Sequence, residues 1–142
     1  MIENFDKAFK VVLDIEGKES NDPTDPGGYT KFGLSSVYNP TVNKNTTLAE
    51  AKEIYREKYW GPICDKAKFP MDVCLFDGMV NPQLGGNKEI LDKNPGVSWQ
   101  EFLLLRMLRY KKLSKDKYVK GHLFRCLKLY QAILDWDKVC LR

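Results

Sequence analysis

The sequence predicts a mainly α-helical domain that carries a small β-hairpin near its N-terminal end. Three observations lead to this prediction. Apolar residues recur at helical spacing in several segments, two capping boxes mark helix starts, and a Gly- and Pro-rich stretch at residues 20–36 interrupts the helical pattern. With 142 residues, 43% of them hydrophobic and 30% charged, the chain fits a single domain over residues 1–142.

The first helix is expected over residues 2–16. Phe5, Phe9 and Val12 share one face of this helix, and Glu16 takes the position where a fourth apolar side chain would stand. The Gly- and Pro-rich stretch follows at once. Its Gly27-Gly28 pair indicates a tight turn, and residues 29–33 read as a short hairpin strand.

The later elements are expected to be helices joined by short connections. One begins at the capping box of residues 47–50 and runs to about Trp60, with Pro62 beyond its end. Others are expected over residues 70–81, over 98–112 after a second capping box, and over 117–136. Residues 84–97, rich in Gly, Asn and Pro, are expected to be irregular, so the part from about 84 to 142 is otherwise helical.

Glu16 is the first candidate for chemistry. A carboxyl at the edge of a core loses water, which disfavours its ionised form, and the C-terminal dipole of the helix acts in the same direction. Such a group can stay protonated near neutral pH. Glycosidic bond cleavage uses a protonated carboxyl together with an ionised one. A solvated Glu16 at a fraying helix end is the structural alternative.

The loop after Glu16 supplies candidates for the second carboxylate, namely Asp22 and Asp25. Thr30 adds a hydroxyl that can position a nucleophilic water by hydrogen bonding. The structural alternative is that the Asp-Pro pairs only shape turns.

Three ordered motifs resemble those of glycoside hydrolase family 108. The first is Ile15-Glu16-Gly17 followed by Asn21-Asp22-Pro23-Thr24-Asp25-Pro26-Gly27-Gly28-Tyr29-Thr30-Lys31-Phe32-Gly33. The second is Tyr59-Trp60-Gly61-Pro62-Ile63, and the third is Phe76-Asp77-Gly78-Met79-Val80-Asn81. The resemblance implies a lysozyme-like N-acetylmuramidase, of a family with many phage or prophage members, and it places Glu16 at the position of the catalytic acid. A further resemblance to the Glu/Asp/Thr set of phage-type lysozymes favours Asp25 as the second carboxylate, on the hairpin loop, with Asp22 supporting the loop.

Two departures from the family pattern stand out. Lys18 replaces the second Gly of the family's Glu-Gly-Gly, and a cation there would tend to lower the pKa of Glu16. The C-terminal part lacks the family's usual peptidoglycan-binding pattern, so we expect no dedicated wall-binding module of that type.

Aromatic and amide side chains are candidates for a saccharide cleft, since sugar rings stack on aromatics and their hydroxyls need fixed partners. The candidate substrate-binding residues are Tyr29, Tyr59, Trp60, Asn81 and Gln83. The structural alternative is a core position for Tyr59 and Trp60, and a helix C-cap for Asn81.

Four cysteines, Cys64, Cys74, Cys126 and Cys140, show no Cys-x-x-Cys spacing, and the one histidine, His122, stands alone. Buried free thiols are therefore expected, and neither a metal nor another cofactor.

Residues 106–128 contain nine basic residues and a single acid, Asp116, so this run carries +8 while the chain as a whole carries +4. Such a run favours contact with anionic polymers of the cell wall or envelope. It also keeps open a rival reading as a small helical nucleic-acid-binding protein, with Tyr110, Tyr118 and Phe124 as stacking residues. A wall-binding protein without catalytic activity is a third reading.

The implied activity is cleavage of the β-1,4 bond between N-acetylmuramic acid and N-acetylglucosamine in peptidoglycan. Whether the anomeric centre inverts or is retained, or whether a lytic transglycosylase forms a 1,6-anhydro ring, stays open. We expect a monomeric endolysin without a signal peptide or a membrane span, held in the host cytoplasm before lysis and acting afterwards at the wall and periplasm.

Overall fold

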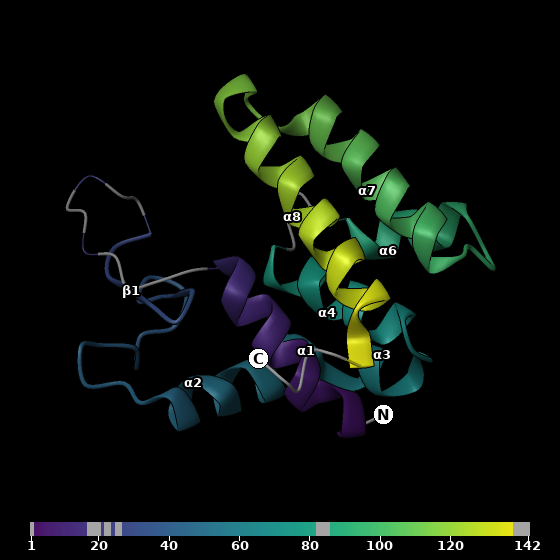
Figure 1. Cartoon of the computed structure of the whole chain (residues 1–142). Helices are drawn as coiled ribbons and strands as arrows, with labels where there is room; N and C mark the ends of the chain where they lie inside the picture. Colours follow the sequence, from purple (N-terminus) through teal and green to yellow (C-terminus); the bar gives the residue numbers. More distant parts are fainter. Residues whose placement is uncertain (1, 17–20, 22–23, 25–26, 82–85, 138–142) are drawn as a thin grey trace.

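The computed structural model describes residues 2–16, 21, 24, 27–81 and 86–137, and these residues form a mainly helical structure (Figure 1). The helices are α1 (Ile2–Glu16), α2 (Leu48–Ile54), the π-helix η1 (Tyr55–Trp60), α3 (Gly61–Lys66), α4 (Met71–Val80), α6 (Asn87–Lys93), α7 (Trp99–Leu113) and α8 (Asp116–Leu134). Strand β1 (Thr30–Lys31) pairs antiparallel with β2 (Leu34–Ser35). The predicted mainly α, lysozyme-like class with a small hairpin is confirmed.

Helix α1 lies in the middle of the molecule. The hairpin and α2 lie on one side of it, and α7 and α8 form an antiparallel pair on the other (Figure 1). Helix α1 contacts η1, α4 and α8, so three segments distant in sequence meet along it. No helix in the described part of the chain is both long and apolar enough to cross a membrane.

Aromatic side chains form the centre of the core. Phe5 of α1 lies with its ring centroid 5.4 Å from that of Trp60 and 5.8 Å from that of Phe76, both edge-on. Phe9 meets Tyr55 at 5.4 Å. Edge-to-face pairs at these distances are favourable beyond their buried area, so the cluster fixes α1 against η1 and α4.

Two helix starts follow from local hydrogen bonds. At Thr47 the side chain accepts from the backbone N–H of Glu50, and the Glu50 carboxylate accepts from the backbone N–H of Thr47. Ser98 and Glu101 repeat the arrangement at the start of α7. Both predicted capping boxes are confirmed.

The helix expected to run from residue 47 to Trp60 is divided. After Ile54 the backbone adopts the π-helical η1, whose wider turn brings Tyr55 and Trp60, five residues apart, onto the same buried side. Gly61 then takes φ +51°, and Pro62 lies in the first turn of α3. The predicted helix end at about Trp60, with Pro62 beyond it, is confirmed. The sequence did not predict that Pro62 lies in the first turn of a further helix, α3, where the missing N–H of proline is not needed.

The expectation of an irregular segment over 84–97 was wrong for its middle part, because α6 occupies Asn87–Lys93. Asn87 is buried and donates from Nδ2 to the Leu75 carbonyl at 2.8 Å, which joins α6 to α4. Packing against α4 and α7 therefore stabilises this short helix. The Gly and Pro residues on either side of it had favoured the prediction of an irregular segment.

Candidate active site

Glu16 is the last residue of α1, on the face that Phe5, Phe9 and Val12 bury in the core. Its side chain retains 20% of its exposure, which leaves a path to solvent. Glu16 therefore lies at the edge of the core, as the sequence predicts.

The β-hairpin turn packs directly against Glu16. Phe32 and Gly33 connect the two strands with φ of +51° and +77°, the positive values of a type I′ hairpin turn. A Cβ added at Gly33 would lie 2.6 Å from Cβ of Glu16 and 2.7 Å from the Tyr55 hydroxyl oxygen. The Tyr55 hydroxyl donates to the Phe32 carbonyl at 3.0 Å. Position 33 therefore requires glycine, because its φ is positive and because a Cβ there would clash with Glu16 and Tyr55. The hydrogen bond from Tyr55 holds the turn against the core.

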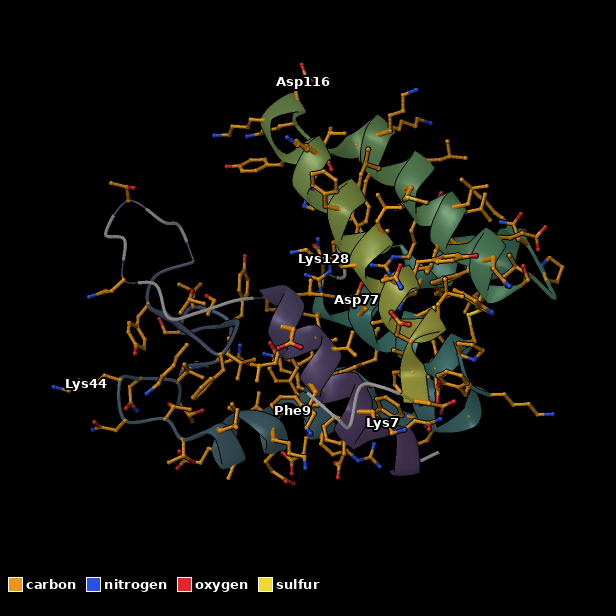
Figure 2. All side chains as sticks on the ribbon, viewed as in Figure 1. Lys7, Phe9, Lys44, Asp77, Asp116 and Lys128 are labelled. Atoms are coloured by element: carbon orange, nitrogen blue, oxygen red, sulfur yellow. The ribbon has the colours of Figure 1, made fainter. Side chains whose placement is uncertain are left out.

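A chain of charges extends from Glu16 into the interior. Oε1 of Glu16 accepts from Nη1 of Arg125 on α8. Nη2 of Arg125 lies 2.7 Å from Oδ1 of Asp77 on α4, and Oδ2 of Asp77 lies 2.8 Å from Nη2 of Arg106 on α7. Figure 2 labels Asp77 near the middle of the molecule. Two acids and two arginines thus alternate across four helices.

Burial raises the pKa of Glu16 above its ordinary value, Arg125 opposes that shift, and the negative charge of Asp77 supports it. The net direction is upward, so a larger fraction of Glu16 is protonated near neutral pH than in a solvated Glu. The desolvation expected from sequence is therefore present. The opposing cation that the structure describes is Arg125, whereas Lys18 lies outside the described residues.

Asp77 has the opposite character. Burial disfavours its ionised form, yet Arg125 and Arg106 together outweigh burial and hold the pKa of Asp77 below its ordinary value. Asp77 therefore stays ionised. Its side chain has no exposed surface, so it cannot reach a substrate or a bulk water. A second carboxylate for catalysis must come from another position.

The predicted second carboxylates, Asp25 and Asp22, lie outside the described residues, as does Gln83. Thr30 begins β1, pairs with Ser35 across the hairpin and is half-buried. The hairpin that contacts Glu16 thus also carries Thr30. Tyr29, next to it, is half-buried and packs against the core.

The remaining predicted saccharide contacts differ in exposure. Tyr59 is half-buried; its ring lies 5.4 Å from that of Tyr55, and its hydroxyl accepts from Asn39. Asn81 follows α4 and is half-buried. Trp60 has 0% exposure and donates its indole N–H to Asp65 at 2.8 Å. A ring without exposed surface cannot stack on a sugar, so Trp60 belongs to the core and the substrate-binding prediction for it is corrected.

The basic run of residues 106–128 is not one surface patch, which corrects the sequence-based reading. Arg106 has 0% exposure and Arg125 retains 11%, and both pair with the buried Asp77. Arg109 pairs with Glu89. The exposed cations of the run are its lysines, and Tyr110, a proposed stacking residue, is buried. The support for a nucleic-acid-binding surface is correspondingly reduced.

Sequence reasoning missed Arg125, Asp77 and Arg106 as parts of the site. A signal was present, because Arg106 lies at helical spacing from Phe102 and Tyr110, on the buried face of α7. An arginine on an apolar face requires a buried acid as partner.

Cys64, Cys74 and Cys126 are buried free thiols, as predicted, and burial raises the pKa of all three. Cys140 lies outside the described residues.

The model of the family described as glycosyl hydrolase 108 matches residues 9–82, which include Glu16, the hairpin and Asp77. The chain belongs to glycosyl hydrolase family 108. Neither the curated proteins nor the solved structures contain a significant match to it. Membership of family 108 makes the chain a glycosidase of the peptidoglycan-degrading class. The family match ends before α6, so Arg106 and Arg125 come from outside the matched segment.

Proposed function

We propose that this family 108 glycosidase is an N-acetylmuramidase that hydrolyses the β-1,4 bond between N-acetylmuramic acid and N-acetylglucosamine. Glu16 donates the proton to the glycosidic oxygen. The observation that carries this role is the raised pKa of a partly exposed Glu16 beneath the hairpin. A raised pKa favours the protonated form that a general acid needs, and the exposed part of the side chain gives it access to solvent.

We assign the second role to Asp25, as the carboxylate that stabilises the oxocarbenium-like centre or activates water. Thr30 orients that water or the loop. Support for Asp25 comes from its place in the motif of residues 21–33 and from the contact between this loop's hairpin and Glu16. Tyr29, Tyr59, Asn81 and Gln83 are the proposed contacts to the sugar, and Asp22 the loop support.

The test compares wild type with Glu16→Gln on purified peptidoglycan, with mass spectrometry of the soluble products. Gln keeps the size of the side chain but has no proton to transfer, and Arg125 keeps its pair with Asp77, so the fold should persist. We expect reducing N-acetylmuramic acid ends from wild type and a loss of several orders of magnitude in the variant. Near-full activity of Glu16→Gln would reject Glu16 as the acid.

The same products separate the two reaction outcomes. Reducing ends indicate hydrolysis, whereas 1,6-anhydro ends indicate a lytic transglycosylase, which needs no activated water. Asp25→Asn should be severe for a hydrolase with two carboxylates and mild for a transglycosylase.

We further propose a biological role as a phage or prophage endolysin, held in the host cytoplasm until a membrane lesion admits it to the wall. Exposed lysines of α7 and α8 would then favour binding to anionic wall polymers. Expression in bacteria with and without a membrane-permeabilising partner tests this role. Lysis that depends on permeabilisation supports it, and lysis without permeabilisation counts against it.

A further inference from the structure

Exposed apolar side chains gather on α7, α8 and the turn between them. Of the large apolar side chains that the structure shows as exposed, seven lie there: Leu104, Leu108, Leu113, Tyr118, Phe124, Leu127 and Leu134. On α8, Phe124 is 49% exposed and Leu127 51%. The opposite face of α8 is occupied, because Cys126, Leu129 and Ile133 pack in the core.

Lysines share the exposed side of α8 with these apolar residues. Lys117, Lys120 and Lys128 are exposed and recur with Phe124 and Leu127 at helical spacing. Lys117 lies 4.8 Å from the ring centroid of Tyr118, and Lys120 5.6 Å from that of Phe124. Residues 117–134 contain no acid. None of these three lysines forms an ion pair within the described residues, so their charge is available to a partner.

We infer that the outer side of α8, defined by Lys117, Lys120, Phe124, Leu127 and Lys128, binds the surface of an anionic phospholipid bilayer. A helix with lysines around exposed aromatic and aliphatic side chains suits the lipid interface. The apolar groups enter the boundary of the acyl chains while the lysines reach the headgroups. Binding needs no unfolding of α8, because the residues that face the bilayer are already exposed.

The chemistry of this α8 surface favours a bilayer over other occupants. A second copy of the chain would bring lysines against lysines across a symmetric contact. An anionic sugar polymer offers negative charges that can pair with the lysines, but no apolar surface that could cover the side chain of Leu127. Nucleic acid offers phosphates, and bases that stack on Phe124, but no comparable site for an aliphatic side chain. A bilayer accommodates all five residues.

The test is co-sedimentation of the full chain with vesicles of phosphatidylglycerol and phosphatidylethanolamine, and with vesicles of phosphatidylcholine alone. Phe124→Ser with Lys120→Gln removes one aromatic ring and one charge from the α8 surface. Tyr38→Ser with Lys44→Gln is the matched control, since Tyr38 is 65% exposed and Lys44 is exposed in a loop remote from α8 (Figure 2).

We expect wild type to bind the anionic vesicles and not the phosphatidylcholine vesicles. The α8 double variant should lose about tenfold or more of that affinity, and added salt should weaken binding further. The control should bind like wild type. Equal binding of the two double variants, equal binding to both vesicle types, or no vesicle binding by wild type overturns the proposal.

A second measurement distinguishes a bilayer from nucleic acid. In Phe124→Trp the new indole should be quenched by lipids brominated on their acyl chains, because residue 124 would lie at that depth. Absence of quenching, together with salt-sensitive binding to a short DNA duplex that depends on Phe124 and Lys120, would assign the surface to nucleic acid and refute the bilayer.

Discussion

Replacement of Asp77 by Asn tests the buried charge chain most directly. Asp77 has no exposed surface, and guanidinium nitrogens of Arg125 and Arg106 lie 2.7 and 2.8 Å from its two oxygens. At an effective dielectric constant of about 20, each contact amounts to about 6 kcal/mol of Coulomb attraction, which offsets the cost of burying the charges. Asn keeps the shape of the side chain but leaves two cations around a neutral amide.

Removal of one partner from a buried ion pair costs about 3–5 kcal/mol of unfolding free energy. For a chain of this length, that corresponds to a fall in Tm of about 10–17 °C. The assay is urea denaturation followed by circular dichroism, with Asp92→Asn as the control. Asp92 is an exposed acid that pairs with Lys88 on the surface of α6, and loss of such a pair should cost under about 1 kcal/mol.

The pH dependence provides a further check. The pKa of Asp77 is lower in the folded than in the unfolded chain, so its stabilisation is present above the unfolded value of about 3.9 and disappears as pH falls through the folded value. The difference between wild type and Asp77→Asn should therefore shrink in acid. A difference below about 1 kcal/mol at neutral pH would refute the reasoning.

Three further predictions concern the site and the helix starts. Arg125→Gln removes the group that lowers the pKa of Glu16, so the alkaline limb of the activity profile should move to higher pH; an unchanged limb on soluble glycan substrate would contradict this. Gly33→Ala forces a Cβ to within 2.6 Å of Cβ of Glu16 at φ +77°, so activity should fall sharply, and wild-type turnover would argue against the packed turn. Thr47→Ala and Ser98→Ala should each lower unfolding free energy by about 1 kcal/mol in urea denaturation, and unchanged midpoints would argue against the capping boxes.

Local signals in the sequence predicted much of this fold. The apolar spacing of α1 and the hydroxyl and carboxylate pairs at Thr47 and Ser98 act within a few residues, so they are legible without knowledge of the fold. Glu16 was identified for the same reason, because its place on the apolar face of its own helix is a local property.

Features set by distant contacts were not predicted. The partner of Glu16 is Arg125, 109 residues away, and nothing near either residue specifies the pair. A count of charges over residues 106–128 treats buried and exposed cations alike, so it assigned Arg106 to the surface. The π-helical turn was not predicted either, because it depends on the burial of both Tyr55 and Trp60 in the core, which is a tertiary contact.

The family match over residues 9–82 provides both acids of the charge chain, while both arginines come from α7 and α8. A ribosome therefore completes the segment containing Glu16 and Asp77 long before the cations that neutralise them. The same asymmetry constrains protein engineering. A foreign C-terminal half joined after residue 82 would have to present two guanidinium groups at matching positions, or Asp77 would become an uncompensated charge in the interior.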